Sequence, residues 1–370
     1  MAHMPAPLLR TLIVSARYSS SGASHSAIRA VLCSRRALST QSSSNEKLQS
    51  KKADEGAFRG VEGLHYGDIP AVSSARDGGP IADDWVMFHP VYTKEELKAV
   101  QTSAHREALT MSDKFANFLI RVLRFGFDLV SGYSHKEIPP GSTMTLEELR
   151  KKGYVNTESR WLHRILFLET VAGIPGMAAA TIRHLHSLRI MRRDAGWIHT
   201  LLEEAENERM HLMTFMTIKK PGILFRAAVL ATQGVFYNIF FLSYLINPRI
   251  CHRFVGYLEE EAVKTYTICI SDIESGHFPE WENMPAPEIA KDYWRLAPNA
   301  TVLDMIYAVR SDEATHRFVN HSLANLKKND VNPFAIREPD MTVKGVKYGF
   351  EREESADYVR DSQKMIQKRD

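Results

Sequence analysis

Cysteine is scarce in this sequence. It occurs only at Cys33, Cys251 and Cys269 in a chain of 370 residues. Such dispersed thiols provide neither a disulfide framework nor a cysteine-ligated metal site. A strong charge imbalance is also absent, because the formal net charge is +3. The sequence therefore gives no indication of a nucleic-acid partner.

Acidic residues are absent from the first 45 positions. This segment carries five arginines, many serines and short apolar runs such as residues 12–16 and 30–33. That composition is typical of a mitochondrial transit peptide, and the apolar runs are too short for a secretory signal. The alternative is a disordered basic tail. We expect residues 1–45 to be a transit peptide that is cleaved between Ser39 and Glu46.

The rest of the chain divides into three segments of different composition. Residues 46–110 are mostly polar and are predicted to form an extended N-terminal arm able to lie along a partner subunit. A capping box, Thr93-Lys-Glu-Glu96, predicts a short helix near its end. Residues 111–330 carry the apolar periodicities of a helical domain. Residues 331–370 are polar and are predicted to form a peripheral C-terminal tail.

Four long segments of the helical domain place acids on their apolar faces. These segments are residues 159–190, 195–218, 249–275 and 302–328, and Pro175 is expected to kink the first of them. Two of the segments add a histidine three residues after the acid, on the same face. The residues concerned are Glu169, Glu208 with His211, Glu259, and Glu313 with His316.

A charged side chain in an apolar core is costly unless it is paired or binds a metal. Taken singly, each Glu-x-x-His pair is better explained as a solvated helix face or a core salt bridge than as a pair of metal ligands. Two further pairs, Glu62 with His65 and Glu274 with His277, lie in glycine-containing loop sequence and are interpreted as chance. Two pairs on apolar stripes, together with two lone inward glutamates, form the ligand set of a bundle that holds two iron or manganese ions. The predicted fold is therefore all-α, a ferritin-like four-helix bundle with a dinuclear centre.

Two further segments suggest contact with a membrane. Residues 113–133 show a broad apolar face edged by Lys114 and Arg121, a pattern of a helix in a membrane interface or of an amphipathic core helix. Residues 223–246 carry a single formal charge and are long enough to span a bilayer. A span would separate the ligand helices on either side of it. We therefore favour a monotopic helix that dips into one leaflet over a transmembrane helix or a buried central helix.

Several other residues lie beside the predicted ligands. Asn207 and Asp312 each directly precede a ligand glutamate and are candidates to accept an N–H from a ligand histidine; the alternative is a solvated polar residue. Tyr266 lies two turns beyond Glu259 on the same face. It is a candidate electron and proton donor, although a buried tyrosine usually forms only a hydrogen bond. Ordinary packing is the interpretation that the residues alone favour for Tyr244, Tyr293 and Trp294.

Taken together, these motifs resemble the mitochondrial alternative oxidase family. The resemblance covers about residues 90–330 and rests on Leu168-Glu-Thr170, Asn207-Glu-Arg-Met-His-Leu212, Leu258-Glu-Glu-Glu-Ala262 and Arg310-Ser-Asp-Glu-Ala-Thr-His-Arg317, in this order. It implies a monotopic, homodimeric enzyme on the matrix face of the inner mitochondrial membrane. Such an enzyme oxidises ubiquinol and reduces dioxygen to water, insensitive to cyanide and without pumping protons. The resemblance implies two iron ions per chain, with the ligands Glu169, Glu208, His211, Glu259, Glu313 and His316.

The same resemblance implies a quinol pocket. Its residues are Arg164, Leu168, Ala262 and Thr265, with Tyr266 in the lining and Arg124 and Asp128 at the mouth. It also places His252 and Trp294 near the ligands. Plant members are regulated through a cysteine in the arm, and this chain has none between residues 46 and 250. Disulfide locking and keto-acid activation at that thiol are therefore not expected. The forms of the two Glu-x-x-His motifs resemble animal-type members.

Two other functions fit part of this pattern. A di-iron quinone-ring hydroxylase of the same fold would place oxygen in its product instead of releasing water. A non-catalytic, membrane-bound iron store would hold iron without consuming oxygen. We expect a ubiquinol oxidase, with Tyr266 as the candidate radical or proton donor.

Overall fold

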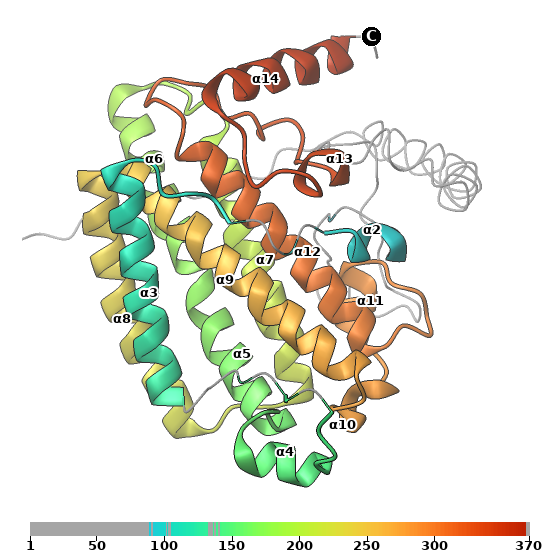
Figure 1. Cartoon of the computed structure of the whole chain (residues 1–370). Coiled ribbons are helices and arrows are strands. Elements are labelled where there is room, and N and C mark those ends of the chain that lie inside the picture. Colours follow the sequence, from blue (N-terminus) through green and yellow to red (C-terminus); the bar gives the residue numbers. More distant parts are fainter. Residues whose placement is uncertain are drawn as a thin grey trace, which may run out of the picture. The chain divides into compact units, whose positions relative to one another are not determined.

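A computed structural model of the chain describes His89 and residues 92–367, except for 101, 103–104, 132–135, 137 and 140. The chain divides into two units, Met1–Phe58 and Arg59–Asp370, and all described residues belong to the second. The predicted transit peptide and most of the predicted arm lie outside the described residues. Helices dominate the described part (Figure 1), where an isolated bridge between Pro285 and Thr301 is the one β feature.

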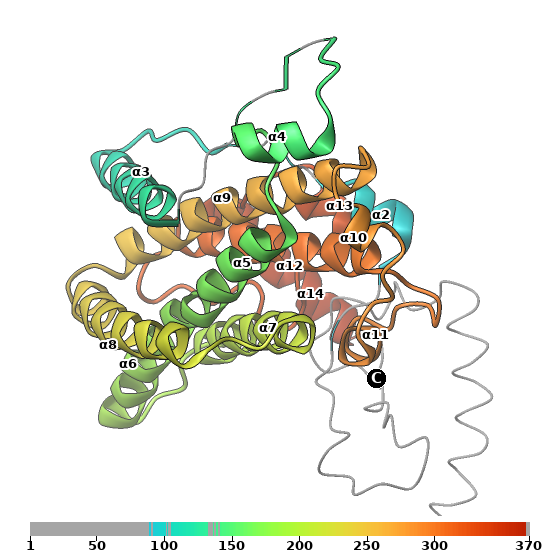
Figure 2. The same cartoon turned by 90° about the horizontal axis from the view of Figure 1, so that it is seen from below.

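Four long helices form the predicted bundle (Figure 2). They are α5 (Glu158–Ala172), α7 (Trp197–Ile218), α9 (Pro248–Glu274) and α12 (Val302–Leu323). The α5 helix packs against α7, α9 packs against α12, and α7 also contacts α12. Local sequence fixes where these helices begin: Thr301 and Asp304 form a capping box at α12, and the Asn247 side chain caps α9 ahead of Pro248. The prediction of an all-α bundle is confirmed.

The predicted helix 159–190 is two helices. The α5 helix ends at Ala172, and α6 (Ile174–Ile190) begins with Pro175 in its first turn. Proline cannot donate the hydrogen bond of a continuous helix but is well suited to a first turn, so it starts a new helix here instead of kinking one. Gly176 then brings α6 close to α7, because a Cβ at this position would lie 2.4 Å from the carbonyl oxygen of Leu201.

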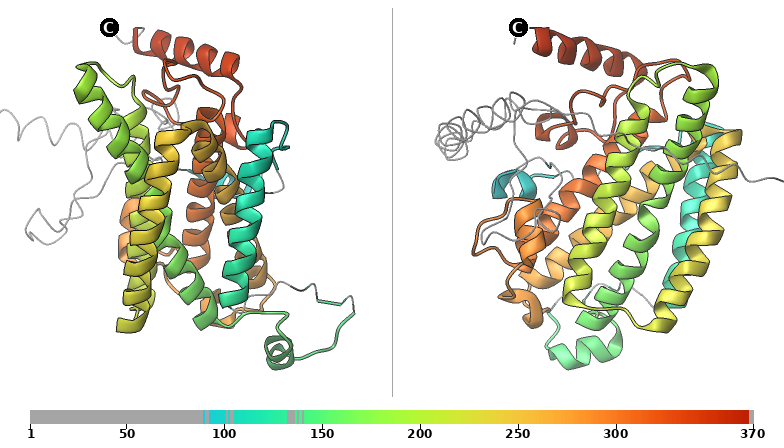
Figure 3. Two further views of the ribbon diagram at one scale, coloured as in Figure 1. Left: turned by 90° about the vertical axis from the view of Figure 1, so that its left-hand side faces the viewer. Right: turned by 180° about the vertical axis from the view of Figure 1, so that it is seen from behind.

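Two apolar helices lie on one side of the bundle, where they face the viewer in the left panel of Figure 3. They are α3 (Met111–Ser131) and α8 (Ile223–Ile246). Large apolar side chains on both are exposed, including Phe125 at 70% and Leu224 at 87%. By length and composition α8 is able to cross a membrane, and only 11% of its apolar stretch is buried, against 50% for a similar stretch in Glu158–Ile190. The two helices therefore give this side of the molecule an apolar surface.

Short helices complete the fold. The predicted capping box at Thr93 begins α2 (Lys94–Lys98). The segments between the long helices contain α4 (Leu146–Lys152), α10 (Pro279–Glu282) and α11 (Glu288–Tyr293). The segment predicted as a polar tail contains α13 (Met341–Lys344) and α14 (Arg352–Gln367).

The C-terminal segment is less peripheral than its composition indicates. Its aromatic residues Phe334, Phe350 and Tyr358 are buried against Trp197 of α7 and Phe318 of α12. A few buried aromatic side chains can anchor a segment that is polar on average, since each removes a large apolar area from water. Residues 334–358 therefore contribute to the core.

Candidate metal centre

Six buried side chains from the four bundle helices meet in the interior. They form two groups whose ligand atoms lie within 4.8 Å of one another, Glu169, Glu208, His211 and Glu313 in the first, and Glu208, Glu259, Glu313 and His316 in the second. Each group has one histidine and one glutamate of its own, and both share Glu208 and Glu313. Two overlapping groups of this kind would suit two metal ions.

The atoms that face this centre are poorly satisfied by the protein itself. Among the described residues, Glu169 Oε2, both carboxylate oxygens of Glu208, and the Nδ1 atoms of His211 and His316 are buried without a hydrogen-bond partner. Buried polar atoms normally have a partner, so several orphans around one point indicate a ligand. The Nδ1 atom of His211 lies 3.4 Å from Glu169 Oε2, and that of His316 lies 2.7 Å from Glu208 Oε1. Anionic oxygen with neutral imidazole is a donor set that suits two iron ions.

The protonation of these side chains follows from their burial. Burial raises the pKa of Glu169 to about 8 and raises the pKa of Glu259 well above its usual range. Burial alone lowers the pKa of His211, but the hydrogen bond to Asp312 and the nearby carboxylates of the neighbouring glutamates outweigh it and hold this pKa well above the usual value. Metal binding requires neutral histidines and ionised carboxylates, so iron and protons compete for the same atoms.

Asp312 is hydrogen-bonded to one of the predicted ligand histidines. Its Oδ2 accepts hydrogen bonds from Nε2 of His211 at 3.1 Å, from Nε1 of Trp294 at 2.9 Å and from Nδ2 of Asn207 at 2.9 Å. Its Oδ1 lies 2.9 Å from Nε2 of His89. A carboxylate on the far nitrogen of a histidine fixes the tautomer that directs the other nitrogen at a metal. Asp312 thus takes the position expected from the sequence, on a histidine of a different helix.

Asn207 does not accept an N–H from a ligand histidine. Its amide nitrogen donates to Asp312 and to the hydroxyl of Tyr293, at 2.8 Å, and so it supports the orienting carboxylate instead. The carboxylate of Asp312 is the stronger acceptor for the histidine, because it carries the charge. Trp294 likewise contributes more than packing, because its indole N–H donates to Asp312. Its ring also stacks on His211 with a centroid separation of 5.8 Å.

Tyr266 is in direct contact with a predicted ligand. Its hydroxyl donates a hydrogen bond to Glu169, and its ring stacks on Phe215. Burial raises the pKa of this phenol well above its usual value. The side chain is therefore a neutral phenol, hydrogen-bonded to the centre.

Three of the predicted quinol residues lie together between α3 and α5. Arg164 forms an ion pair with Asp128 at 2.7 Å, and Asp128 lies 3.4 Å from Nε of Arg124. Arg164 also borders a cavity of about 310 Å³, whose walls include the stacked rings of Phe127 and Phe167. This volume is sufficient for a ring-sized ligand. Leu168, Ala262 and Thr265 are not among the described residues that line this cavity. Leu168 and Ala262 are half-buried, and Thr265 is buried with its hydroxyl donating to the Glu261 carbonyl.

His252 belongs to a buried polar chain on the other side of the centre. Its Nε2 pairs with the hydroxyl of Tyr244 at 3.0 Å and its Nδ1 with Oδ1 of Asn320 at 3.0 Å, while Nδ2 of Asn320 donates to Glu204 at 2.7 Å. Glu204 was not among the predicted site residues. It lies one turn before Glu208, and burial raises its pKa to about 7. The spacing of four residues from Glu208 was the available signal, but it does not distinguish an inward acid from a solvated one.

Comparison with known proteins gives a consistent result. The profile of the family described as alternative oxidase matches residues 92–325. Among curated proteins, "Alternative oxidase, mitochondrial" of Cryptococcus neoformans var. grubii is 53% identical over 338 residues, covering 90% of this chain and 84% of the relative. The protein of the same name from Emericella nidulans is 55% identical over 276 residues, covering 72% of this chain and 75% of the relative. These relatives are fungal, so the expectation of an animal-type member is not supported, because a motif of a few residues does not separate lineages.

The fold and the site define a di-iron carboxylate protein built on a helical bundle. The four glutamates and two histidines of the two groups all lie within the match to the family profile. The chain belongs to the alternative oxidase family. It is accordingly a ubiquinol oxidase, an enzyme whose oxygen chemistry takes place at a di-iron site.

Proposed function

We propose that this chain oxidises ubiquinol at the matrix face of the inner mitochondrial membrane and reduces dioxygen to water, as a homodimer insensitive to cyanide and without pumping protons. In balanced form, two ubiquinols and one dioxygen yield two ubiquinones and two waters. The observation that carries the proposal is the pair of buried ligand groups that share Glu208 and Glu313. Bound there, two irons would supply the redox chemistry that passes electrons from quinol to oxygen.

The proposed ligands are the six residues of the two groups. Glu208 and Glu313 belong to both groups, Glu169 and His211 to the first and Glu259 and His316 to the second, and together these residues would hold the two ions. Asp312 keeps the Nδ1 atom of His211 directed at the centre by accepting from Nε2. Tyr266, held on Glu169, is the proposed proton or electron donor. Among the tyrosines that the structure describes, Tyr266 is the one whose hydroxyl forms a hydrogen bond to a proposed ligand.

The proposed quinol site lies beside the apolar helices. The cavity next to Arg164 is bordered by Phe127 of α3, a helix that exposes large apolar side chains. The aromatic rings would pack on the quinol ring, and the paired Arg164 and Asp128 would bind its hydroxyl oxygens as donor and acceptor. Arg164 lies five residues before Glu169, which is about 7 Å along a helix axis. Leu168, Ala262, Thr265 and Arg124 belong to the proposed lining by family position.

The exposed faces of α3 and α8 support the proposed monotopic attachment. Both helices lie on one side of the bundle, so both can enter the same leaflet without separating the ligand helices. Flotation with vesicles of inner-membrane lipids tests this attachment. Substituting exposed residues Phe118 and Leu123 with serine is expected to weaken flotation without loss of iron, since neither contacts the centre.

Oxygen uptake is the decisive assay. The purified protein is expected to consume oxygen with a soluble quinol in the presence of cyanide, and Glu208→Ala is expected to abolish this uptake. The matched control is Glu206→Ala on the same helix, whose side chain pairs with Arg209 at the surface. Full uptake by Glu208→Ala would refute the assignment. With isotope-labelled dioxygen, label in the quinone instead of in water would identify a hydroxylase, and sedimentation of the detergent-solubilised protein as a monomer would refute the dimer.

A further inference from the structure

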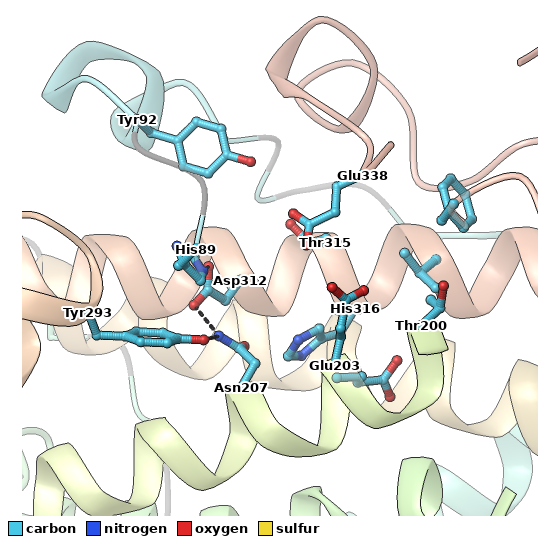
Figure 4. Close-up of a pocket in the computed structure, with 13 residues that line it drawn as sticks. His89, Tyr92, Thr200, Glu203, Asn207, Tyr293, Asp312, Thr315, His316 and Glu338 are labelled. Atoms are coloured by element: carbon cyan, nitrogen blue, oxygen red, sulfur yellow. Dashed lines mark hydrogen bonds and ion pairs between the residues drawn. The ribbon is translucent and has the colours of Figure 1, made fainter. Parts of the chain in front are cut away.

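A second cavity touches the metal centre on the side away from α3 and α8. It lies between α7 and α12, has a volume of about 60 Å³ and is drawn in Figure 4. Glu203, Glu204 and Asn207 of α7 and His316 of α12 line it, together with Glu338 from the C-terminal segment. His316 is one of the proposed iron ligands, so this cavity leads directly to the centre.

The charged residues that line this cavity differ from those that line the quinol cavity. Four carboxylates, those of Glu203, Glu204, Asp312 and Glu338, border it, and no lysine or arginine is among its described lining residues. The cavity beside α3 is bordered instead by Arg160 and Arg164, with no carboxylate among the lining residues that the structure describes. A concave surface of one charge sign concentrates ions of the other sign. The polar cavity therefore suits a cation better than the quinol cavity does.

Burial of the acids increases toward the centre. At the outer end, Glu203 has 25% of its side chain exposed and pairs with His199 at 3.1 Å. Further in, Glu204 and Asn207 are each 7% exposed, and His316 is 6% exposed. A cation that moves inward thus exchanges water for protein oxygens step by step.

Asn207 offers a fixed oxygen along this path. Its amide nitrogen is held by Asp312 and Tyr293 (Figure 4), whereas its Oδ1 is buried and, within the described part of the chain, has no hydrogen-bond partner. An amide oxygen held in this way is a neutral ligand for a hard cation. It is an observation independent of the acidic lining, and it points to the same kind of ligand.

We propose that this cavity is the route by which ferrous iron reaches the dinuclear centre. The proposal rests on the iron ligands proposed above. Iron would meet Glu203 and Glu338 first, then Glu204 and Asn207, and would arrive at His316 and Glu208, whose facing atoms are 2.7 Å apart. Quinol and iron would then use separate openings of different charge on the two sides of the bundle.

The test measures iron transfer in both directions. Release of iron from the reduced holoenzyme to a ferrous chelator is followed anaerobically by absorbance, and reloading of the same full-length protein is followed with ferrous iron alone. Glu203→Gln and Glu338→Gln are expected to slow release and reloading together, each by about threefold to tenfold, with the dissociation constant unchanged. Glu206→Gln removes one charge from the same helix outside the cavity and is expected to leave both rates unchanged.

The possible results separate the proposed iron route from the proposed set of iron ligands. Wild-type rates in both cavity variants would overturn the route, as would a change in release alone, which would mean altered affinity at the centre. A wild-type protein that binds fewer than two irons per chain would instead overturn the ligand set. A protein that holds two irons and whose cavity variants exchange them at the wild-type rate would overturn only the route.

Discussion

The sharpest test of the site is the replacement of Asp312 by asparagine. This change keeps the size of the side chain but removes its charge. In the folded protein Asp312 is 3% exposed and accepts hydrogen bonds from His211, Trp294 and Asn207 on one oxygen. An asparagine at this position either presents an N–H to these donors or turns a neutral oxygen toward them, and both choices weaken the hold on His211.

The size of the effect follows from these contacts. A hydrogen bond to a charged group contributes about 1.5–3 kcal/mol, and loss of a partner behind a metal-ligating histidine typically weakens metal binding by about 10- to 100-fold. We therefore expect Asp312→Asn to lose iron to a competing chelator at a concentration about 10- to 100-fold lower than wild type does. Trp294→Phe removes one donor and keeps the carboxylate, so its effect on iron affinity is expected to be smaller.

Chelator titration of the purified holoproteins, with iron content measured by absorbance, checks this order. Asp292→Asn on α11, a half-buried aspartate outside the centre, is the matched control and is expected to titrate as wild type. If Asp312→Asn holds iron as tightly as wild type, the carboxylate does not orient His211, and the argument from the hydrogen-bond geometry is refuted.

Three further predictions concern packing, pH and the quinol. Gly176→Ala is expected to lower the free energy of unfolding by about 1–3 kcal/mol, because the new Cβ would lie 2.4 Å from the Leu201 carbonyl oxygen. Gly234→Ala is expected not to destabilise the fold, because no heavy atom lies within 4 Å of the new Cβ. Denaturant titration compares the two variants. Burial lowers the pKa of Lys344 to about 8 from 10.5, so between these pH values the unfolded chain binds the extra proton and stability rises with pH. Relative to Lys344→Met, wild type should gain up to about 3 kcal/mol across this window, and parallel pH profiles of the two proteins would contradict the assignment. Asp128→Asn removes the carboxylate shared by Arg164 and Arg124. In steady-state oxygen uptake it is expected to raise the KM for quinol about tenfold with a smaller change in kcat. A large fall in kcat with an unchanged KM would argue against a binding role.

The two cavities of the bundle are lined by residues of different chemistry. The aromatic cavity beside α3 faces the apolar side of the molecule, while the acidic cavity lies between α7 and α12 on another side. Neither cavity is visible in the sequence as a motif. The first combines residues of α3 and α5 and the second combines α7, α12 and the C-terminal segment, so both depend on how distant segments pack.

Local sequence determined most of the helices and which buried acids and histidines are candidate ligands. Apolar periodicity, caps and prolines act over a few residues, so they are readable without the fold. The same holds for Glu208, His211, Glu313 and His316, because residues three apart on a helix necessarily share a face. Pro175 shows where this reasoning reaches its limit: the sequence marks an interruption but does not distinguish a kink from a new helix.

Tertiary structure decided the contacts between helices. His211 is oriented by Asp312 from another helix, Asn207 supports that carboxylate instead of binding a histidine, and Glu204 joins a buried chain to Asn320 and His252. Phe334, Phe350 and Tyr358 bring a polar segment into the core. The physical reason is common to these cases. Periodicity states which side of a helix is buried, but only the packing of whole helices determines which atom meets which inside the bundle.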